Sequence, residues 1–239
     1  MIKPRTYLIT LLLVILGLYY WYSISTPRKF NLKAHLYKYN TVKTQISHQR
    51  DSLRKTYQQA SKTEKQVLVK HSQRYLQTSL GQKIFPYWYG TRWSYSGTTS
   101  SPRKGKVACG YFVTTTLQHA GFKLNRYRLA QQAASVIIRR LCEKKSIQTI
   151  GNNDTEKLIA YLRKQPDGMY ILGLDTHVGF IEKRQGKLDF IHSSFSTRRR
   201  VVREPVINSL VISNSSIYVV GNLLANKKLV KHWLLKKKV

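Results

Sequence analysis

The apolar positions divide the chain into a helical first part and a β-rich second part. Before the turn at Pro166-Asp167-Gly168, apolar residues recur at the three- and four-residue spacing of helices. After the turn they alternate as in strands, in the segments GMYILGL, HVGFIE, KLDFIH, RVVREPV and SIYVVGN. Helices followed by strands predict an α+β domain, with the helices packed on one side of an antiparallel sheet.

Four helices are expected before the turn, and one more at the C-terminus. The expected ranges are 63–81, ending at Gly81, 109–120, with Gly121 as its C-terminal stop, 128–141, and a helix that starts at a capping box at Asn153. The aromatic segment that begins at Ile84 is expected to be a structured loop. The terminal KKLVKHWLLKKKV is expected to be a short basic helix that caps the domain.

The N-terminal segment has the pattern of a membrane anchor. Residues 6–24, TYLITLLLVILGLYYWYSI, carry no charge and nearly reach the length of a bilayer-spanning helix. The aromatic cluster at residues 19–22 is typical of a membrane interface. We therefore expect residues 1–27 to be an uncleaved transmembrane anchor, with a cleaved signal peptide as the alternative. Residues 28–62 are expected to form a basic linker or loose helix, and residues 63–239 the folded domain, outside the cytoplasm.

The charge of the chain is strongly positive. It contains 42 Lys and Arg residues but only 10 Asp and Glu residues, for a net charge of +32. Such a chain attracts nucleic acid, anionic lipid or an acidic envelope polymer. The basic residues are spread along the chain, and neither a zinc-finger spacing nor an RNA-binding aromatic motif is present. We therefore favour an acidic envelope polymer over nucleic acid as the partner.

Two histidines are expected to meet across a hairpin in the segment HVGFIEKRQGKLDFIH. If Glu182 pairs with Lys187, His177 lies directly opposite His192. Strand alternation then places both imidazoles on the apolar face, where each ring needs a hydrogen-bond partner. Together with Cys109 at a predicted helix start, they suggest a nucleophile, a base and an orienting group.

The position of Cys109 suits a catalytic thiol. A neighbouring imidazole and a helix N-terminus are expected to lower the thiol pKa. The backbone N–H groups that begin the helix can hold a developing oxyanion. Two alternatives stay open. Cys109 and Cys142 could form a disulfide, and Cys109 with the two histidines could hold zinc. A structural zinc site needs four ligands, however, so we expect neither a metal nor a cofactor.

Four short motifs resemble those of the NlpC/P60 superfamily of papain-like cysteine peptidases. The family signature is a GTxYxxGG-like loop, then DCSGFV, HVGIY and FxHAS. The counterparts here are GTRWSYSG (90–97), ACGYFV (108–113), HVGFI (177–181) and FIHSS (190–194). They occur in the family's order and cover roughly residues 82 to 195.

The resemblance implies a papain-like NlpC/P60 fold and assigns site residues. By this implication Cys109 is the nucleophile, His177 the general base and His192 the orienting third member. The expected substrate-binding residues are Trp93, Tyr95, Gly110 and Ser193. The chain departs from the family at Ala108, in place of Asp, at Gly110-Tyr111, in place of Ser-Gly, and at Trp93, in place of a tyrosine for which Tyr95 is a possible substitute.

The implied reaction is hydrolysis of an amide bond in the peptides of the cell wall, with peptidoglycan or another acidic envelope polymer as the partner. The departures leave the substrate class open. The alternatives are a non-catalytic polyanion-binding protein on the same fold, and an acyltransferase or amidase that acts on a non-wall substrate.

Overall fold

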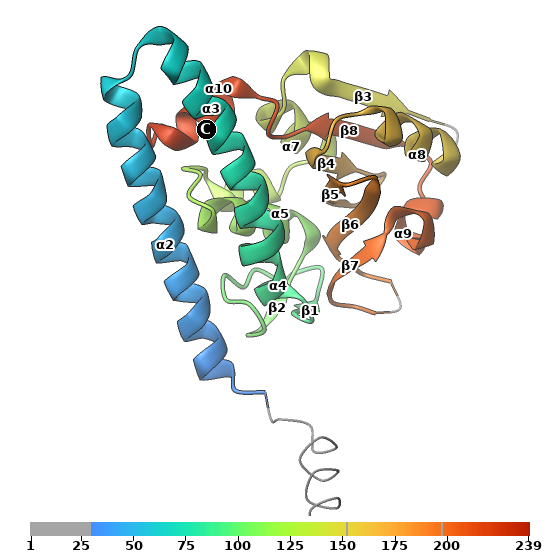
Figure 1. Ribbon diagram of the computed structural model, residues 1–239. Coiled ribbons are helices and arrows are strands. Elements are labelled where there is room, and N and C mark those ends of the chain that lie inside the picture. Colours follow the sequence, from blue (N-terminus) through green and yellow to red (C-terminus); the bar gives the residue numbers. More distant parts are fainter. Residues whose placement is uncertain (1–29, 152, 197) are drawn as a thin grey trace, which may run out of the picture. The chain divides into compact units, whose positions relative to one another are not determined.

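The computed structural model describes residues 30–151, 153–196 and 198–239, which include one compact unit from Lys33 to Val239 (Figure 1). This unit combines helices with a six-stranded antiparallel sheet, so the predicted α+β class is confirmed. The anchor expected at residues 1–27 lies outside the described residues. Among the helices in the described ranges, none has both the length and the apolar composition that crossing a bilayer requires.

The sheet has the strand order β3-β8-β4-β5-β6-β7. Its members are β3 (Ile147–Ile150), β4 (Gly168–Gly173), β5 (Val178–Arg184), β6 (Lys187–Ser193), β7 (Val201–Pro205) and β8 (Tyr218–Asn222). The five strands expected from the sequence are all present. Strand β3 was not expected, because only its last residue, Ile150, is buried and its short IQTI pattern gives little alternation.

The β5–β6 hairpin has a different register from the predicted one. Its turn consists of Gln185 and Gly186, both with positive φ (51° and 76°), as a tight two-residue turn requires. Arg184 therefore pairs with Lys187, and Glu182 pairs with Asp189 instead of Lys187. The predicted pairing is wrong by two residues. Because this shift is even, every side chain stays on its predicted face.

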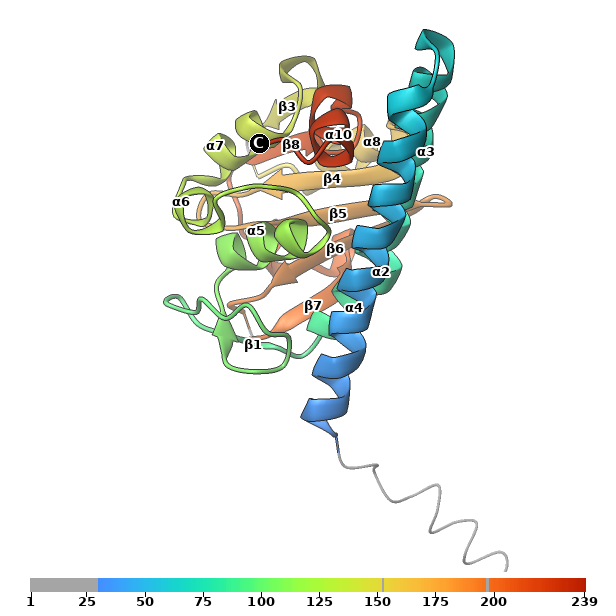
Figure 2. The same ribbon diagram turned by 90° about the vertical axis from the view of Figure 1, so that its left-hand side faces the viewer.

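Helices α5 (Cys109–His119), α6 (Arg126–Ala130) and α7 (Ala134–Leu141) lie on one side of the sheet (Figure 2). The α5 range agrees with the prediction, and Gly121 follows it with φ +100°. The helix expected over 128–141 is two helices instead. The backbone leaves the helical region at Ala133, where ψ is 147°.

The opposite side of the sheet is covered by α8 (Thr155–Lys164), η3 (Val206–Asn208) and α9 (Leu210–Ser213) (Figure 1). The expectation that helices cover only one side of the sheet is therefore wrong. Its physical reason lies in β4, which is buried at all six positions, so both faces of the sheet need an apolar cover. The N-cap of α8 is Asp154, one residue later than expected, and its side chain accepts the N–H of Lys157.

The segment expected to be a basic linker or loose helix is helical, and from Lys33 onward it belongs to the compact unit. Helix α2 (Leu32–Gln59) buries Tyr39, Ile46 and Leu53 in the main core, and the compact unit begins at Lys33 instead of residue 63. The guanidinium of the buried Arg50 donates to the carbonyl of Gly121, 2.5 Å away. This stripe of contacts ties α2 to the end of α5.

The helix expected to end at Gly81 continues past it. Helix α3 (Lys62–Thr78) runs into a π-helical turn, η1 (Ser79–Ile84), and then into α4 (Phe85–Trp88), so part of the expected aromatic loop is helical. Gly81 does not end the helix; instead, its lack of a side chain leaves room for the carboxylate of Glu182. A Cβ at this position would lie 2.4 Å from Oε1 of Glu182.

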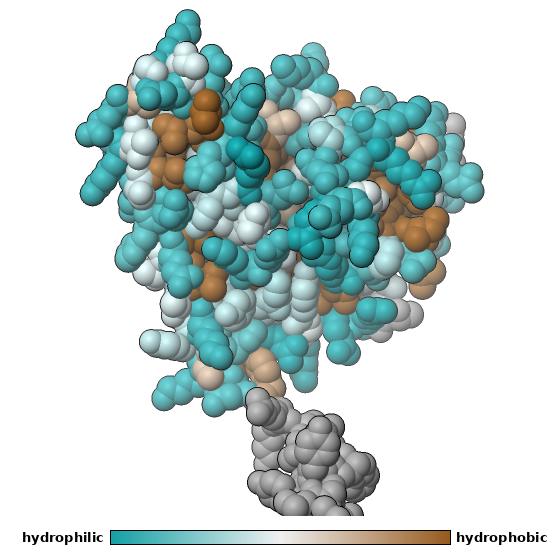
Figure 3. All heavy atoms as spheres, in the orientation of Figure 1, coloured by the Kyte–Doolittle hydropathy of each residue, from teal (hydrophilic) through white to brown (hydrophobic). Residues whose placement is uncertain are grey.

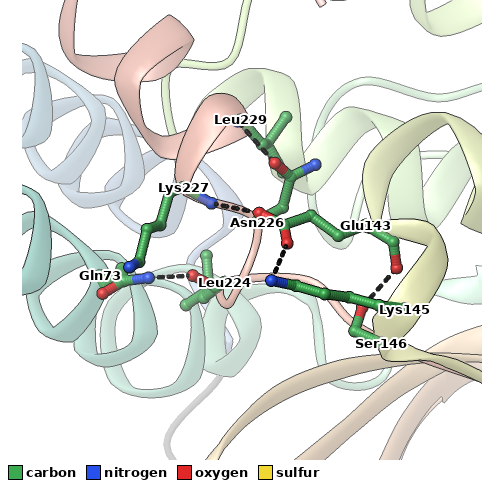
Figure 4. A network of polar contacts seen from close by, with 8 residues as sticks. All are labelled: Gln73, Glu143, Lys145, Ser146, Leu224, Asn226, Lys227 and Leu229. Atoms are coloured by element: carbon green, nitrogen blue, oxygen red, sulfur yellow. Dashed lines mark hydrogen bonds and ion pairs between the residues drawn. The ribbon is translucent and has the colours of Figure 1, made fainter.

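The expected C-terminal capping helix is present as α10 (Lys227–Leu234). The close-up in Figure 4 shows how its N-terminus is held. The side chain of Asn226 accepts the N–H of Leu229, and the N–H of Lys227 donates to Glu143, 3.2 Å away. The amide of Gln73, from α3, donates to the carbonyl of Leu224 at 2.6 Å. These bonds join α10 to α3 and to the residues before β3.

Candidate active site

The loop that carries Cys109 is fixed by neighbouring backbone and side chains. Val107, in β2 (Lys106–Val107), pairs with Trp93, in the parallel strand β1 (Arg92–Trp93). The hydroxyl of the buried Ser193 donates to the carbonyl of Val107 at 2.7 Å. The N–H of Ala108 donates to the carbonyl of Gly97 at 2.8 Å. Two of the predicted substrate-binding residues, Trp93 and Ser193, therefore position the cysteine loop.

Gly110 allows α5 to pack closely against α6. A Cβ on Gly110 would lie 2.3 Å from the carbonyl oxygen of Ala130, so any side chain here would displace one of the two helices. The backbone N–H of Gly110 also acts on the thiol of Cys109 as a hydrogen-bond donor. The structure thus gives this predicted residue a packing role and a backbone role.

The Cys109 thiol lies against the start of β5. The largest influence that lowers the pKa of this thiol comes from the backbone of Val178, the residue directly after His177. Burial raises the pKa of the thiol, and the N–H groups of Val178, Gly110 and Cys109 offset only part of this rise. The expectation of a lowered thiol pKa is therefore wrong for the resting structure, because burial favours the uncharged thiol more than these donors favour the thiolate.

His177 and His192 form a buried pair. The Nε2 atom of His177 lies 2.8 Å from Nδ1 of His192, and the side chains are 3% and 0% exposed. The rings meet edge to face, at 87°. In the observed register His192 is adjacent to Gly179, where a Cβ would lie 2.7 Å from that of His192. Gly179 thus leaves the space in which the two imidazoles meet diagonally.

Both imidazoles are shifted toward their neutral forms. Burial lowers the pKa of His177 well below its ordinary value, and the charge of His192 lowers it further. Burial also lowers the pKa of His192, although Glu204 partly opposes this shift. An uncharged His177 ring can accept a proton, which is the state that a general base needs.

Glu204, on β7, contacts the second nitrogen of His192. Its Oε1 atom lies 3.2 Å from His192 Nε2. Glu204 lies in a strand that the sequence predicts, but no role was expected for it. One signal could have drawn attention to it, since it is one of only ten acidic residues and lies in a predicted strand. Its facing partner depends on the β6–β7 register, which the sequence does not reveal.

Aromatic rings connect Trp93 to the histidine pair. The ring centres of Trp93 and Phe195 are 6.2 Å apart, and those of Phe195 and His177 are 5.3 Å apart. On the far side, Phe190 stacks on His192 at 4.0 Å. Phe195 was not predicted, although it directly follows the FIHSS motif. Tyr95, the possible substitute for the family tyrosine, is 90% exposed.

A small pocket of about 90 Å³ opens beside His177. Its lining includes Phe195 and Leu210, whose side chains are themselves partly exposed. Figure 3 shows a hydrophobic patch on the surface in the region of α9, within a largely hydrophilic face. Asp175 also lines this pocket, where its carboxylate accepts the N–H groups of Ser216 and Ile217. The access to His177 is therefore partly apolar.

Cys142 and His119 have structural environments. Both cysteines are free, so the alternative of a Cys109–Cys142 disulfide is not realised. Cys142 is buried, and burial raises its pKa to about 12. His119 hydrogen bonds the hydroxyl of Tyr39, and burial lowers its pKa to about 4. Among the described residues, no three His, Cys, Asp or Glu side chains are grouped as metal ligands.

Comparison with known proteins gives no relative. No protein-family model, no curated protein and no solved structure matches the chain.

Proposed function

We propose that this protein is a cysteine hydrolase in which Cys109 is the nucleophile and His177 the general base. One observation carries the proposal. The backbone of Val178, the residue that follows His177, lowers the pKa of the Cys109 thiol, and His177 is itself hydrogen bonded to the buried His192. Nucleophilic acyl transfer needs a thiol within reach of an oriented imidazole, and we propose that Cys109 and His177 meet in this way.

In the proposed reaction the thiol proton moves to His177 as the sulfur attacks an amide carbonyl. His177 Nε2 is engaged by His192, so Nδ1 is the nitrogen that receives the proton. The N–H groups at the start of α5 stabilise the oxyanion. The imidazolium then protonates the leaving amine, and water, deprotonated by the same ring, releases the acyl group from Cys109.

We further propose that the chain is a divergent, papain-like member of the NlpC/P60 superfamily. Three features support this: the order of the four motifs, a cysteine that opens a helix, and two histidines carried by antiparallel neighbours. The proposed substrate is an amide in peptidoglycan peptides, and the proposed location is outside the cytoplasm, on a membrane anchor at residues 1–27. The net charge of +32 suits an anionic wall polymer.

The test uses the full chain with purified wall fragments and identifies the products by mass. We expect the wild type and Cys142→Ser to release new amine termini, and Cys109→Ser to release none. Cys142→Ser is the matched control, since it removes the same atom at a buried site away from the proposed chemistry. Acyl transfer to an added amine in place of water would favour the acyltransferase alternative. Hydrolysis by Cys109→Ser at the wild-type rate would refute the proposal.

A second candidate function, binding of a polyanion without catalysis, is favoured by a groove of about 410 Å³ beside α3 and α10. Five of its lining residues are lysines: Lys62, Lys65, Lys70, Lys227 and Lys231. If binding is the whole function, a soluble polyphosphate should bind in a salt-dependent way, Lys65→Gln combined with Lys231→Gln should weaken it, and no wall amide should be cut.

A further inference from the structure

The outer nitrogen of the histidine pair faces a carboxylate. His192 Nε2 lies 3.2 Å from Glu204 Oε1, and the side chain of Glu204 is only 16% exposed. The β6–β7 ladder holds the two residues, because His192 pairs with Val202 and Phe190 with Glu204. The carboxylate is thus placed by the sheet beside an imidazole that is completely buried.

This geometry fixes the hydrogens of both rings. A carboxylate accepts hydrogen bonds but has no hydrogen to donate, so His192 Nε2 must carry one. A neutral His192 then has a lone pair at Nδ1, and Nδ1 accepts from His177 Nε2. With its hydrogen on Nε2, His177 has an unprotonated Nδ1. Because Glu204 can only accept a hydrogen bond, it determines the positions of the hydrogens on both rings. Nδ1 of His177 is therefore the nitrogen that is free to take a proton.

We infer that Glu204 is a positioning residue, which sets the tautomer of His192 and through it the tautomer of His177. The catalytic meaning of this inference rests on the proposed function; the tautomers themselves do not. When His177 becomes positively charged during proton transfer, the same carboxylate stabilises that charge through His192. The acting unit is then Cys109, His177, His192 and Glu204.

Two polar side chains contact His192: His177, which directly precedes β5, and Glu204, on β7. Arg198 acts on Glu204 from a distance. Burial raises the pKa of Glu204, but His192, Ser209 and Arg198 lower it by more, so the group is a carboxylate at neutral pH. Arg203, the preceding residue, has its guanidinium bound to Glu182 and Asp189 instead. Strand alternation places that cluster on the other face of the sheet.

The direct test reads the ring nitrogens by long-range ¹H–¹⁵N spectra of the full chain. In the wild type both His177 and His192 should be Nε2–H tautomers. In Glu204→Gln, where the amide can donate or accept, both rings should lose this single tautomer. Glu156→Gln, which removes one charge from an exposed position on α8, should leave them unchanged. Retention of both tautomers in Glu204→Gln, or an Nδ1–H tautomer in the wild type, would overturn the inference.

Kinetics provide the second readout. Glu204→Gln should lower kcat about tenfold to a hundredfold with little change in KM, as for other groups that orient a histidine through its second nitrogen. If the wild type cuts wall fragments through Cys109 and Glu204→Gln cuts them equally fast, the inference fails and the proposed function stands. If Cys109→Ser is fully active, the proposed function fails, and the tautomers still decide the structural role of Glu204.

Discussion

Burial makes both partners of the proposed proton transfer neutral at rest. It raises the pKa of the Cys109 thiol and lowers that of the His177 imidazole well below its ordinary value. A pre-formed thiolate–imidazolium pair would need shifts in the opposite directions. The structure therefore favours a thiol that loses its proton during attack, with the base already neutral.

The alkylation of Cys109 by a small uncharged reagent tests the resting state. Because the thiol pKa is raised, the rate should increase with pH through a midpoint above the ordinary value of about 8.5. Peptide mass mapping separates this reaction from that of the buried Cys142. A midpoint well below 8.5 would instead reveal a pre-formed ion pair.

The pH dependence of hydrolysis tests His177. A general base is active when unprotonated, so a lowered pKa extends activity to lower pH. We expect kcat/KM to stay constant as the pH falls through 6.5, and to decline only at more acidic pH. An acidic limb centred at or above pH 6.5 would mean that burial does not control this imidazole.

The Gly179→Ala variant tests how closely β5 and His192 approach each other. In Gly179→Ala the new methyl would lie 2.7 Å from His192 Cβ and 2.6 Å from a ring carbon of Phe190. The overpacking should cost about 1–3 kcal/mol in the free energy of unfolding, measured in urea, and should reduce hydrolysis. Gly151→Ala is the control, since no atom lies within 4 Å of its new Cβ. Equal stability of the two variants would contradict the close approach.

At the scale of elements, the sequence predicted what depends on local pattern. The range of α5, its stop at Gly121 and five strands of the sheet all follow from periodicity and glycine chemistry. The meeting of His177 with His192 also followed, although from a register that was two residues out. The prediction held because the face on which a side chain lies depends only on whether the register shift is even or odd.

Features that depend on distant contacts were missed. Gly81 looks like a helix stop, but its role is to make room for Glu182, about a hundred residues later in the chain. The raised pKa of Cys109 depends on burial beneath other elements. The contact between Glu204 and His192 depends on which residues β6 and β7 bring together. None of these relations is visible in local sequence.

At the scale of the whole molecule, charge and burial have separate roles. The net charge of +32 is carried by 42 basic side chains, whereas the histidine pair of the proposed site is buried beside aromatic residues. Attraction to an anionic polymer should therefore be independent of the residues that do the chemistry.

This separation predicts the response to salt. The fraction of the full chain that sediments with wall fragments should fall between low ionic strength and 1 M salt. At 1 M salt the electrostatic screening length is only about 3 Å. Cys109→Ser should sediment like the wild type at every salt concentration. Binding that persists at 1 M salt would show that contacts other than charge hold the polymer.

The rate at which purified wall fragments gain new amine termini tests whether the histidine pair activates Cys109. If the pair activates Cys109, we expect release by the wild type and Cys142→Ser and none by Cys109→Ser. We expect a rate about 10²- to 10⁴-fold lower for His177→Gln, the usual loss when a general base is removed. Undiminished release by Cys109→Ser or by His177→Gln would contradict this activation.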